Sequence, residues 1–184
     1  MPAFDKRLLQ RLRIPLGFLF AIVFLVFARP TAITLAIGSV VAIIGLGIRG
    51  WASGHIRKAS KLAVSGPYAF TRNPLYVGSF LLGVGFTIAA GVWWLAVLFC
   101  LLFIGIYLPV MKIEADDVRR IFGTEYDEYA QNVPVFIPRG NVWKRTNVKF
   151  DFRLYLQYRE YRAALGAALA MAALTAKAFF LGSL

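Results

Sequence analysis

The sequence predicts an all-α integral membrane protein with about five transmembrane helices, whose loops and short helices gather at the cytoplasmic face. Three observations lead to this class. Hydrophobic residues make up 59% of the 184-residue chain and charged residues 16%, whereas soluble domains have about 45–50% and about 25%. The apolar residues stand in long uncharged blocks, and the mean hydropathy is +0.66. The basic residues, which give a net charge of +12, lie mostly between these blocks.

The uncharged blocks supply the predicted helices in chain order. A membrane crossing takes about 20 apolar residues. Residues 14–28 are short for one crossing, although flanking residues can extend them, and residues 30–48 suffice for one. Residues 73–111 are long enough for two, with a break near 90–93. Residues 163–184 form the last span if Lys177 snorkels to an interface.

A signal peptide is the alternative for the N-terminus, because a basic start precedes a short apolar stretch. That stretch is followed by Arg29-Pro30 rather than by a small-residue cleavage site. We therefore expect a first span.

The positions of the basic residues predict the orientation. Segments 1–13, 49–72 and 112–162 hold 19 of the 21 lysines and arginines. Five crossings with the N-terminus inside place all three segments in the cytoplasm, as the positive-inside rule requires. The basic charge therefore indicates contact with lipid headgroups and not with nucleic acid. We expect a multi-pass protein whose chemistry lies at the cytoplasmic face.

We expect one membrane domain over residues 1–184, with two N-terminal spans in 1–48 and a core with a helical hairpin in 49–139. Residues 140–184 form an interfacial helix and the C-terminal span. Tyr155, Tyr158 and Arg162 recur there at near-helical spacing among basic residues. This pattern is typical of a helix that contacts anionic headgroups.

Residues 66–78 read GPYAFTRNPLYVG and directly precede the third span. Pro67 and Pro74 each fix their own backbone and bias the preceding residue away from helix. Pro74 suits a first helical turn with Asn73 as N-cap. The unpaired N–H groups of that turn, beside Arg72, favour a carboxylate or a phosphate. The alternative is a membrane entry loop with interfacial tyrosines and a snorkelling arginine.

Residues 110–122 predict a helix that ends at Gly123. Its apolar side contains Val110, Ile113, Val118, Ile121 and Phe122. Glu114 falls in the middle of this side, where a carboxylate is costly unless something pairs with it. Two interpretations stay open: an ion pair with a basic residue such as Arg72, or a ligand-binding carboxylate. Asp117 lies near the edge of the same side.

The next segment, residues 125–133, puts Tyr126, Tyr129 and Val133 on one helical face, which is typical of packing. The two prolines of residues 133–139, VPVFIPR, predict an extended path over the segments beneath. The one histidine, His55, is expected in an interfacial loop.

Together these elements resemble the isoprenylcysteine carboxyl methyltransferase and phospholipid methyltransferase family of integral membrane enzymes. The elements are GPYAFTRNPLYVG, Glu114, FGTEYDEY at 122–129 and VPVFIP at 133–138. Each is weak alone, but the set in this order and spacing is specific. The resemblance covers roughly residues 55 to 139.

The resemblance implies methyl transfer from S-adenosylmethionine to a lipid-like or small apolar acceptor, a carboxylate or an amine, with membrane lipids as partners. It assigns no catalytic residue and no metal ligand, and it does not name the acceptor. The positions that match the family's cofactor contacts are Lys61, Leu62, Tyr68, Arg72, Asn73, Pro74, Tyr76 and Glu114.

The chain departs from the family pattern at four positions. Asn73 stands where the family has a histidine between arginine and proline, and Ala115 replaces the second residue of an acidic pair. Val110 replaces an arginine of the isoprenylcysteine enzymes, and Ser60 replaces a histidine. These departures bear more on the acceptor than on cofactor binding.

Two other function classes stay open. A membrane reductase of the sterol reductase type has a similar arginine-histidine-proline layout but binds NADPH. Ser79 follows Gly78 where those reductases often have an acidic residue, and no cysteine directly precedes the FG element. A non-catalytic membrane protein that kept the fold is the second alternative, favoured by Asn73 and Ala115.

Overall fold

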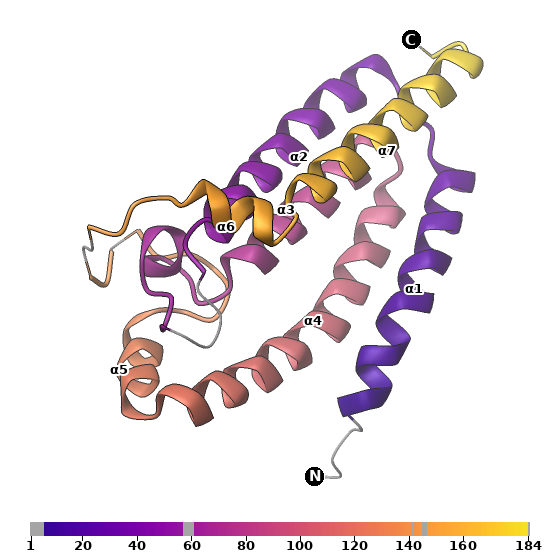
Figure 1. The fold of residues 1–184 in the computed structure, drawn as a ribbon. Coiled ribbons are helices and arrows are strands. Elements are labelled where there is room, and N and C mark those ends of the chain that lie inside the picture. Colours follow the sequence, from indigo (N-terminus) through magenta and orange to yellow (C-terminus); the bar gives the residue numbers. More distant parts are fainter. Residues whose placement is uncertain (1–5, 57–60, 141, 145–146, 184) are drawn as a thin grey trace.

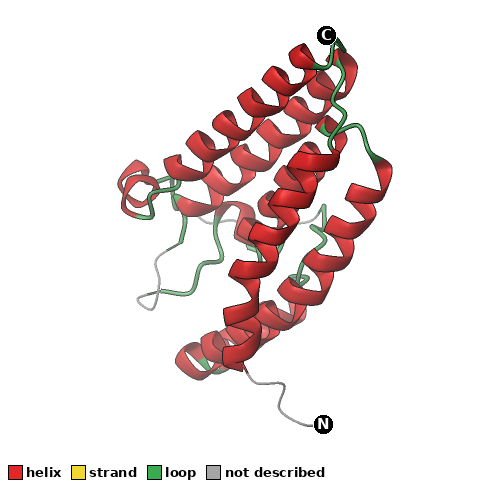
Figure 2. Cartoon of the chain, turned by 90° about the vertical axis from the view of Figure 1, so that its right-hand side faces the viewer, coloured by secondary structure: helices red, strands yellow, loops and turns green. Residues whose placement is uncertain are grey.

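The computed structural model describes residues 6–56, 61–140, 142–144 and 147–183, and the prediction of an all-α protein is confirmed. These residues form no strand. Figure 2 shows helices joined by short turns near the C-terminus and by longer loops at the other end. The helices are α1 (Lys6–Phe27), α2 (Ala32–Ser53), η1 (a 3₁₀ turn, Gly66–Ala69), α3 (Pro74–Ala89), α4 (Trp93–Phe122), α5 (Thr124–Asn132), α6 (Phe152–Gln157) and α7 (Tyr161–Phe180).

Three helices, α2, α4 and α7, are long and apolar enough to cross a membrane, so the prediction of about five crossings is not confirmed among the described residues. The apolar part of α1, Pro15–Phe27, and α3 are shorter. Pro74 starts α3 and the chain turns after Ala89, which leaves a helix about 24 Å long at 1.5 Å per residue. That length falls short of the roughly 30 Å hydrocarbon core. The predicted break near 90–93 is confirmed.

Helices α2 and α3 lie side by side and form the most extensive helix contact of the described chain. Glycines seven residues apart on each helix let the backbones meet. A Cβ atom added at Gly85 would lie 2.5 Å from the amide nitrogen of Ala42, and one added at Gly45 would lie 2.7 Å from the carbonyl oxygen of Gly78. Only small residues permit such an approach, so these glycines fix the register of the two helices.

The end of the bundle that holds turns 28–31, 90–92 and 181–183 is called the turn end here. Its core joins five helices through Phe24, Ala28, Leu35, Ala89, Ala90, Leu95, Leu174 and Ala178. The Arg29 amide donates to the carbonyl of Ala90 at 2.7 Å. The Lys177 ammonium donates to the carbonyls of Leu25 at 2.5 Å and Val26 at 3.0 Å. Lys177 therefore stabilises the C-terminal end of α1 as a cation at a helix C-terminus, in addition to any interfacial role.

The predicted interfacial helix is wrong in its extent. Helix α6 covers only residues 152–157, and Arg162 belongs to α7. The chain breaks between them because Arg159 adopts a left-handed backbone with φ 54°, which non-glycine residues rarely do. The Asp151 side chain caps α6 by accepting from the amide of Arg153.

Candidate functional site

The GPYAFTRNP segment is held by hydrogen bonds from the segments that follow α4. The Tyr129 hydroxyl donates to the carbonyl of Tyr68 at 2.7 Å. The Arg72 amide donates to the carbonyl of Pro134 at 2.9 Å, and the Arg139 amide donates to that of Phe70 at 3.1 Å. Residues 133–139 form no helix, as predicted, but their path bends at residues 133 and 135–137 and is not extended throughout. The segment beneath it is 69–73, which sequence reasoning did not name.

Pro74 begins α3 as predicted, with Asn73 in the N-cap position. The Asn73 side chain makes no cap, however. Its amide nitrogen donates to the carbonyl of Val135 at 2.9 Å instead. The expected side-chain cap is therefore wrong, because the Asn73 side chain bonds to segment 133–139 instead of to the first turn of α3.

A cavity of about 520 Å³ lies between the GPYAFTRNP segment, α4, α5 and the adjoining ends of α2 and α3. Its volume falls in the range of about 300–1,000 Å³ that is typical of small-molecule sites. The structure brings all eight residues singled out from the sequence to its wall: Lys61, Leu62, Tyr68, Arg72, Asn73, Pro74, Tyr76 and Glu114. Their shared cavity supports one site, while what each of them binds stays a prediction.

Glu114 is exposed on the wall of the cavity, where it accepts a hydrogen bond from the Tyr76 hydroxyl at 2.8 Å. The prediction that it points into a buried apolar side is wrong, as is the ion pair with Arg72. That side of α4 does not pack against protein along its whole length: Met111 is buried, but Ile121 is 58% exposed. Sequence periodicity shows which residues share a helical face, but it does not show which segments pack against that face. Asp117 also lines the cavity.

Two buried polar atoms at the cavity have no hydrogen-bond partner among the described residues, namely the Tyr68 hydroxyl and Nε of Arg72. The Arg72 Nη1 donates to the Tyr126 hydroxyl at 3.3 Å, which fixes the direction of the guanidinium. Burial raises the pKa of Tyr68 far above its ordinary value, so its hydroxyl keeps its proton and stays a donor. Buried polar groups without a partner cost free energy, and a bound ligand would offset that cost.

Helix α5 supports this wall by packing, as its tyrosine stripe predicted. Tyr126, Tyr129 and Val133 are buried together with Leu62, and the ring of Trp143 lies 5.3 Å from that of Tyr129. Burial also raises the pKa of Tyr129. Its hydroxyl, unlike that of Tyr68, has a protein acceptor.

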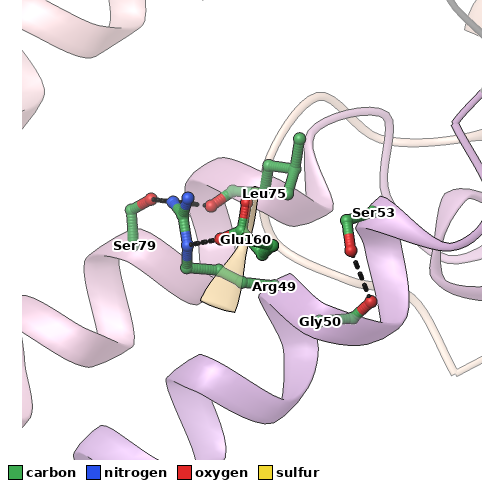
Figure 3. A network of polar contacts seen from close by, with 6 residues as sticks. All are labelled: Arg49, Gly50, Ser53, Leu75, Ser79 and Glu160. Atoms are coloured by element: carbon green, nitrogen blue, oxygen red, sulfur yellow. Dashed lines mark hydrogen bonds and ion pairs between the residues drawn. The ribbon is translucent and has the colours of Figure 1, made fainter. Parts of the chain in front are cut away.

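Sequence reasoning missed Arg49 and Ser79, which line the same cavity. Figure 3 shows the Arg49 guanidinium between Ser79 of α3 and Glu160, the residue before α7. Nε of Arg49 lies 2.5 Å from the Glu160 carboxylate, and its Nη1 donates to the Ser79 hydroxyl. The available signal was an arginine near the end of an otherwise apolar span, since such residues are usually functional or paired.

His55 lies in the turn after α2, as expected of a loop residue, but its side chain is buried; its place at the membrane interface stays a prediction. Its Nδ1 lies 3.1 Å from the Ser65 hydroxyl, and its ring fills the space that a side chain on Gly66 would need. Burial lowers the pKa of His55 and favours the neutral ring. Ser60, the family's histidine position, lies outside the described residues.

The comparisons with known proteins agree with the motifs. The sequence model of the phospholipid methyltransferase family matches residues 18–125, more than half of the chain. The chain belongs to the phospholipid methyltransferase family. This methyltransferase-family chain is also 35% identical over 88 residues to the nickel-cobalt-cadmium resistance protein NccN of Alcaligenes xylosoxydans xylosoxydans.

That match covers 48% of this phospholipid methyltransferase family member and 41% of NccN, so it spans less than half of the relative's length. No solved structure matches the chain. The family match and the helices long enough to cross a bilayer identify a multi-pass membrane protein of a methyltransferase family. The predicted resemblance is confirmed.

Proposed function

We propose that this protein transfers a methyl group from S-adenosylmethionine to a lipid-like or small apolar acceptor, a carboxylate or an amine, at the cytoplasmic face of the membrane. The observation that carries the proposal is the convergence of Tyr68, Arg72 and Glu114 on one cavity, with buried polar atoms of the first two lacking protein partners. Family membership supplies the reaction class.

The residues at the cavity fit the functional groups of S-adenosylmethionine. Its carboxylate suits Nε of Arg72 together with the first N–H groups of α3, because both favour anions. Its ammonium or ribose hydroxyls suit the exposed carboxylate of Glu114. Its sulfonium suits the faces of Tyr68 and Tyr76, since aromatic rings attract cations.

The cofactor supplies an electrophilic methyl group, and the protein has to align an acceptor with it. Positioning alone accounts for much of the rate in such a transfer. A carboxylate acceptor needs no general base. His55, the one histidine of the chain, is not among the residues that line the cavity.

The basic segments support a cytoplasmic site. Segments 1–13, 49–72 and 112–162 hold 19 of the 21 basic residues, and the cavity wall draws on the last two of them. By the positive-inside rule these segments and the N-terminus face the cytoplasm. Membrane lipids are then the immediate neighbours of the site and the natural source of its acceptor.

The experiment is calorimetric titration of the purified protein in lipid nanodiscs with S-adenosylhomocysteine, and with NADPH in parallel. We expect S-adenosylhomocysteine to bind. Glu114→Ala should weaken this binding at least tenfold, because the substitution removes the carboxylate that contacts the ligand. Glu128→Ala, which removes an exposed carboxylate paired with Lys144 away from the cavity, is the matched control. Binding of NADPH instead would favour a reductase, and binding of neither would favour a non-catalytic protein.

A further inference from the structure

An ion pair lies where α2 and α3 adjoin the cavity, which is called its membrane-side end here. Arg49 lies in α2 and Ser79 in α3, both within the helical bundle, and both line the cavity. Glu160 does not line the cavity, and its carboxylate lies 2.5 Å from Nε of Arg49. The side chains of Arg49 and Glu160 are only 22% and 11% exposed, so solvent screens their charges weakly.

Glu160 reaches this position because the C-terminal segment packs onto α2. The Asp151 amide donates to the carbonyl of Gly54 at 3.0 Å, and the Glu160 amide donates to that of Tyr155 at 3.2 Å. The left-handed turn at Arg159 then aims the chain into α7. Glu160 also lies outside residues 18–125, the part that matches the family model. A segment beyond the family match therefore supplies a charge to the site.

The charges around the cavity balance only when Glu160 is included. Among the described residues, three cationic side chains line the cavity, but only two carboxylates do. Glu160 is the third carboxylate. The charged residues that line the cavity are Arg49, Lys61, Arg72, Glu114 and Asp117.

The charge of Glu160 acts inside the cavity and not only on Arg49. Burial is the largest cause of the raised pKa of Tyr68, and the nearby Tyr158, Glu160 and Glu114 raise it further. Two carboxylates, Glu160 and Glu114, therefore lie near enough to affect the Tyr68 hydroxyl.

We propose that the Arg49–Glu160 pair is a specificity-determining element for the charge of the methyl donor. The pair keeps the membrane-side end of the cavity neutral. An excess positive charge there would repel the sulfonium cation of S-adenosylmethionine and so favour the product, S-adenosylhomocysteine, which lacks that charge. Glu160 neutralises Arg49 and does not itself line the cavity, so it is a positioning residue. The inference rests on the proposed function, because it takes S-adenosylmethionine as the donor.

The test uses the one charge that distinguishes donor from product. S-adenosylmethionine carries a sulfonium, whereas S-adenosylhomocysteine carries a neutral thioether. We expect Glu160→Gln, which leaves Arg49 uncompensated, to lower the ratio of donor affinity to product affinity about three- to tenfold. Arg49→Gln should raise the ratio by a similar factor, and the double variant should return it to within about twofold of the wild type. The affinities are measured by calorimetry on full-length protein in nanodiscs.

Three controls separate charge from packing. Ser79→Ala removes the neutral hydrogen bond to Arg49 without changing any charge, so it should affect both ligands alike. Glu128→Gln removes the carboxylate of the exposed pair with Lys144 and should leave the ratio unchanged. Glu160→Asp keeps the charge and should keep the ratio.

Opposite shifts in the two single variants support the inference, because a purely structural role would weaken both ligands together. Shifts in the same direction, or shifts no larger than those of the controls, overturn it. Should Glu160→Gln fail to fold, the raised ratio expected of Arg49→Gln still decides. If the wild type binds neither ligand, the proposed function fails and this inference fails with it. A wild type that binds both, with unshifted variants, overturns the inference alone.

Discussion

At the turn end of the bundle the polar groups are bonded to protein, whereas at the cavity two side chains keep buried polar atoms that no described residue satisfies. The Arg29 amide and the Lys177 ammonium both donate to carbonyls of neighbouring helices. At the cavity, the Tyr68 hydroxyl and Nε of Arg72 have no protein acceptor. The first arrangement serves stability and the second serves binding, and substitutions at the two ends should differ accordingly.

The largest loss of stability is expected where α2 and α3 touch. Gly85→Leu places a side chain against the backbone of Ala42 and the carbonyl of Gly38, and it should lower the free energy of unfolding by roughly 3 kcal/mol. Gly105→Leu is the matched control, since a Cβ atom there meets no atom within 4 Å. Denaturation in mixed detergent micelles measures both. Equal losses in the two variants would contradict the close α2–α3 contact.

Removing one hydroxyl from each of two buried tyrosines gives the sharpest form of the comparison. Tyr129→Phe leaves the buried carbonyl of Tyr68 without its donor and should lower the free energy of unfolding by about 1–3 kcal/mol. Tyr68→Phe removes a hydroxyl that has no partner among the described residues, so it should not destabilise the fold. It should instead weaken binding of S-adenosylhomocysteine.

The two variants therefore remove the same group, but Tyr129→Phe should lower stability and Tyr68→Phe should lower affinity for S-adenosylhomocysteine. Thermal unfolding and calorimetry on the same preparations measure both quantities. A Tyr68→Phe variant that loses stability and keeps its affinity would show that the hydroxyl is structural.

The smallest effect is expected at Lys177, which donates to the last carbonyls of α1. Lys177→Met should lower the free energy of unfolding by about 0.3–1 kcal/mol, the usual contribution of a cation at a helix C-terminus. Affinity for S-adenosylhomocysteine should not change, because the residue lies at the turn end. Lys149→Met, at an exposed position of the C-terminal segment, should have no effect on stability. Loss of affinity in Lys177→Met would contradict the account, because it would show that the turn end also contributes to ligand binding.

Features that depend on local sequence were predictable. Pro74 starts α3 because it fixes its own backbone, and Gly123 ends α4 with a positive φ of 54°. The hairpin between α3 and α4 follows from the length of one uncharged block. The residues of the cavity wall were found because their order resembles a family, and periodicity singled out Glu114 without giving its surroundings.

Features that depend on contacts between distant segments were not predictable. Glu114 is exposed because it faces the cavity, and no local pattern contains that fact. The pair of Arg49 and Glu160 joins residues 111 positions apart, and the register of Gly45 against Gly78 needs the packed helices. An isolated arginine in an apolar span indicates that a partner exists, but not which one.

The central claim is that the cavity, and not the turn end, binds S-adenosylmethionine. Hydrogen–deuterium exchange of the protein in nanodiscs, with and without saturating S-adenosylhomocysteine, tests it most directly. We expect slower amide exchange in peptides that cover residues 66–76 and 110–118, and unchanged exchange in turns 28–31 and 90–92. Protection at the turn end alone, or none at residues 66–76 when the ligand is bound, would contradict the account.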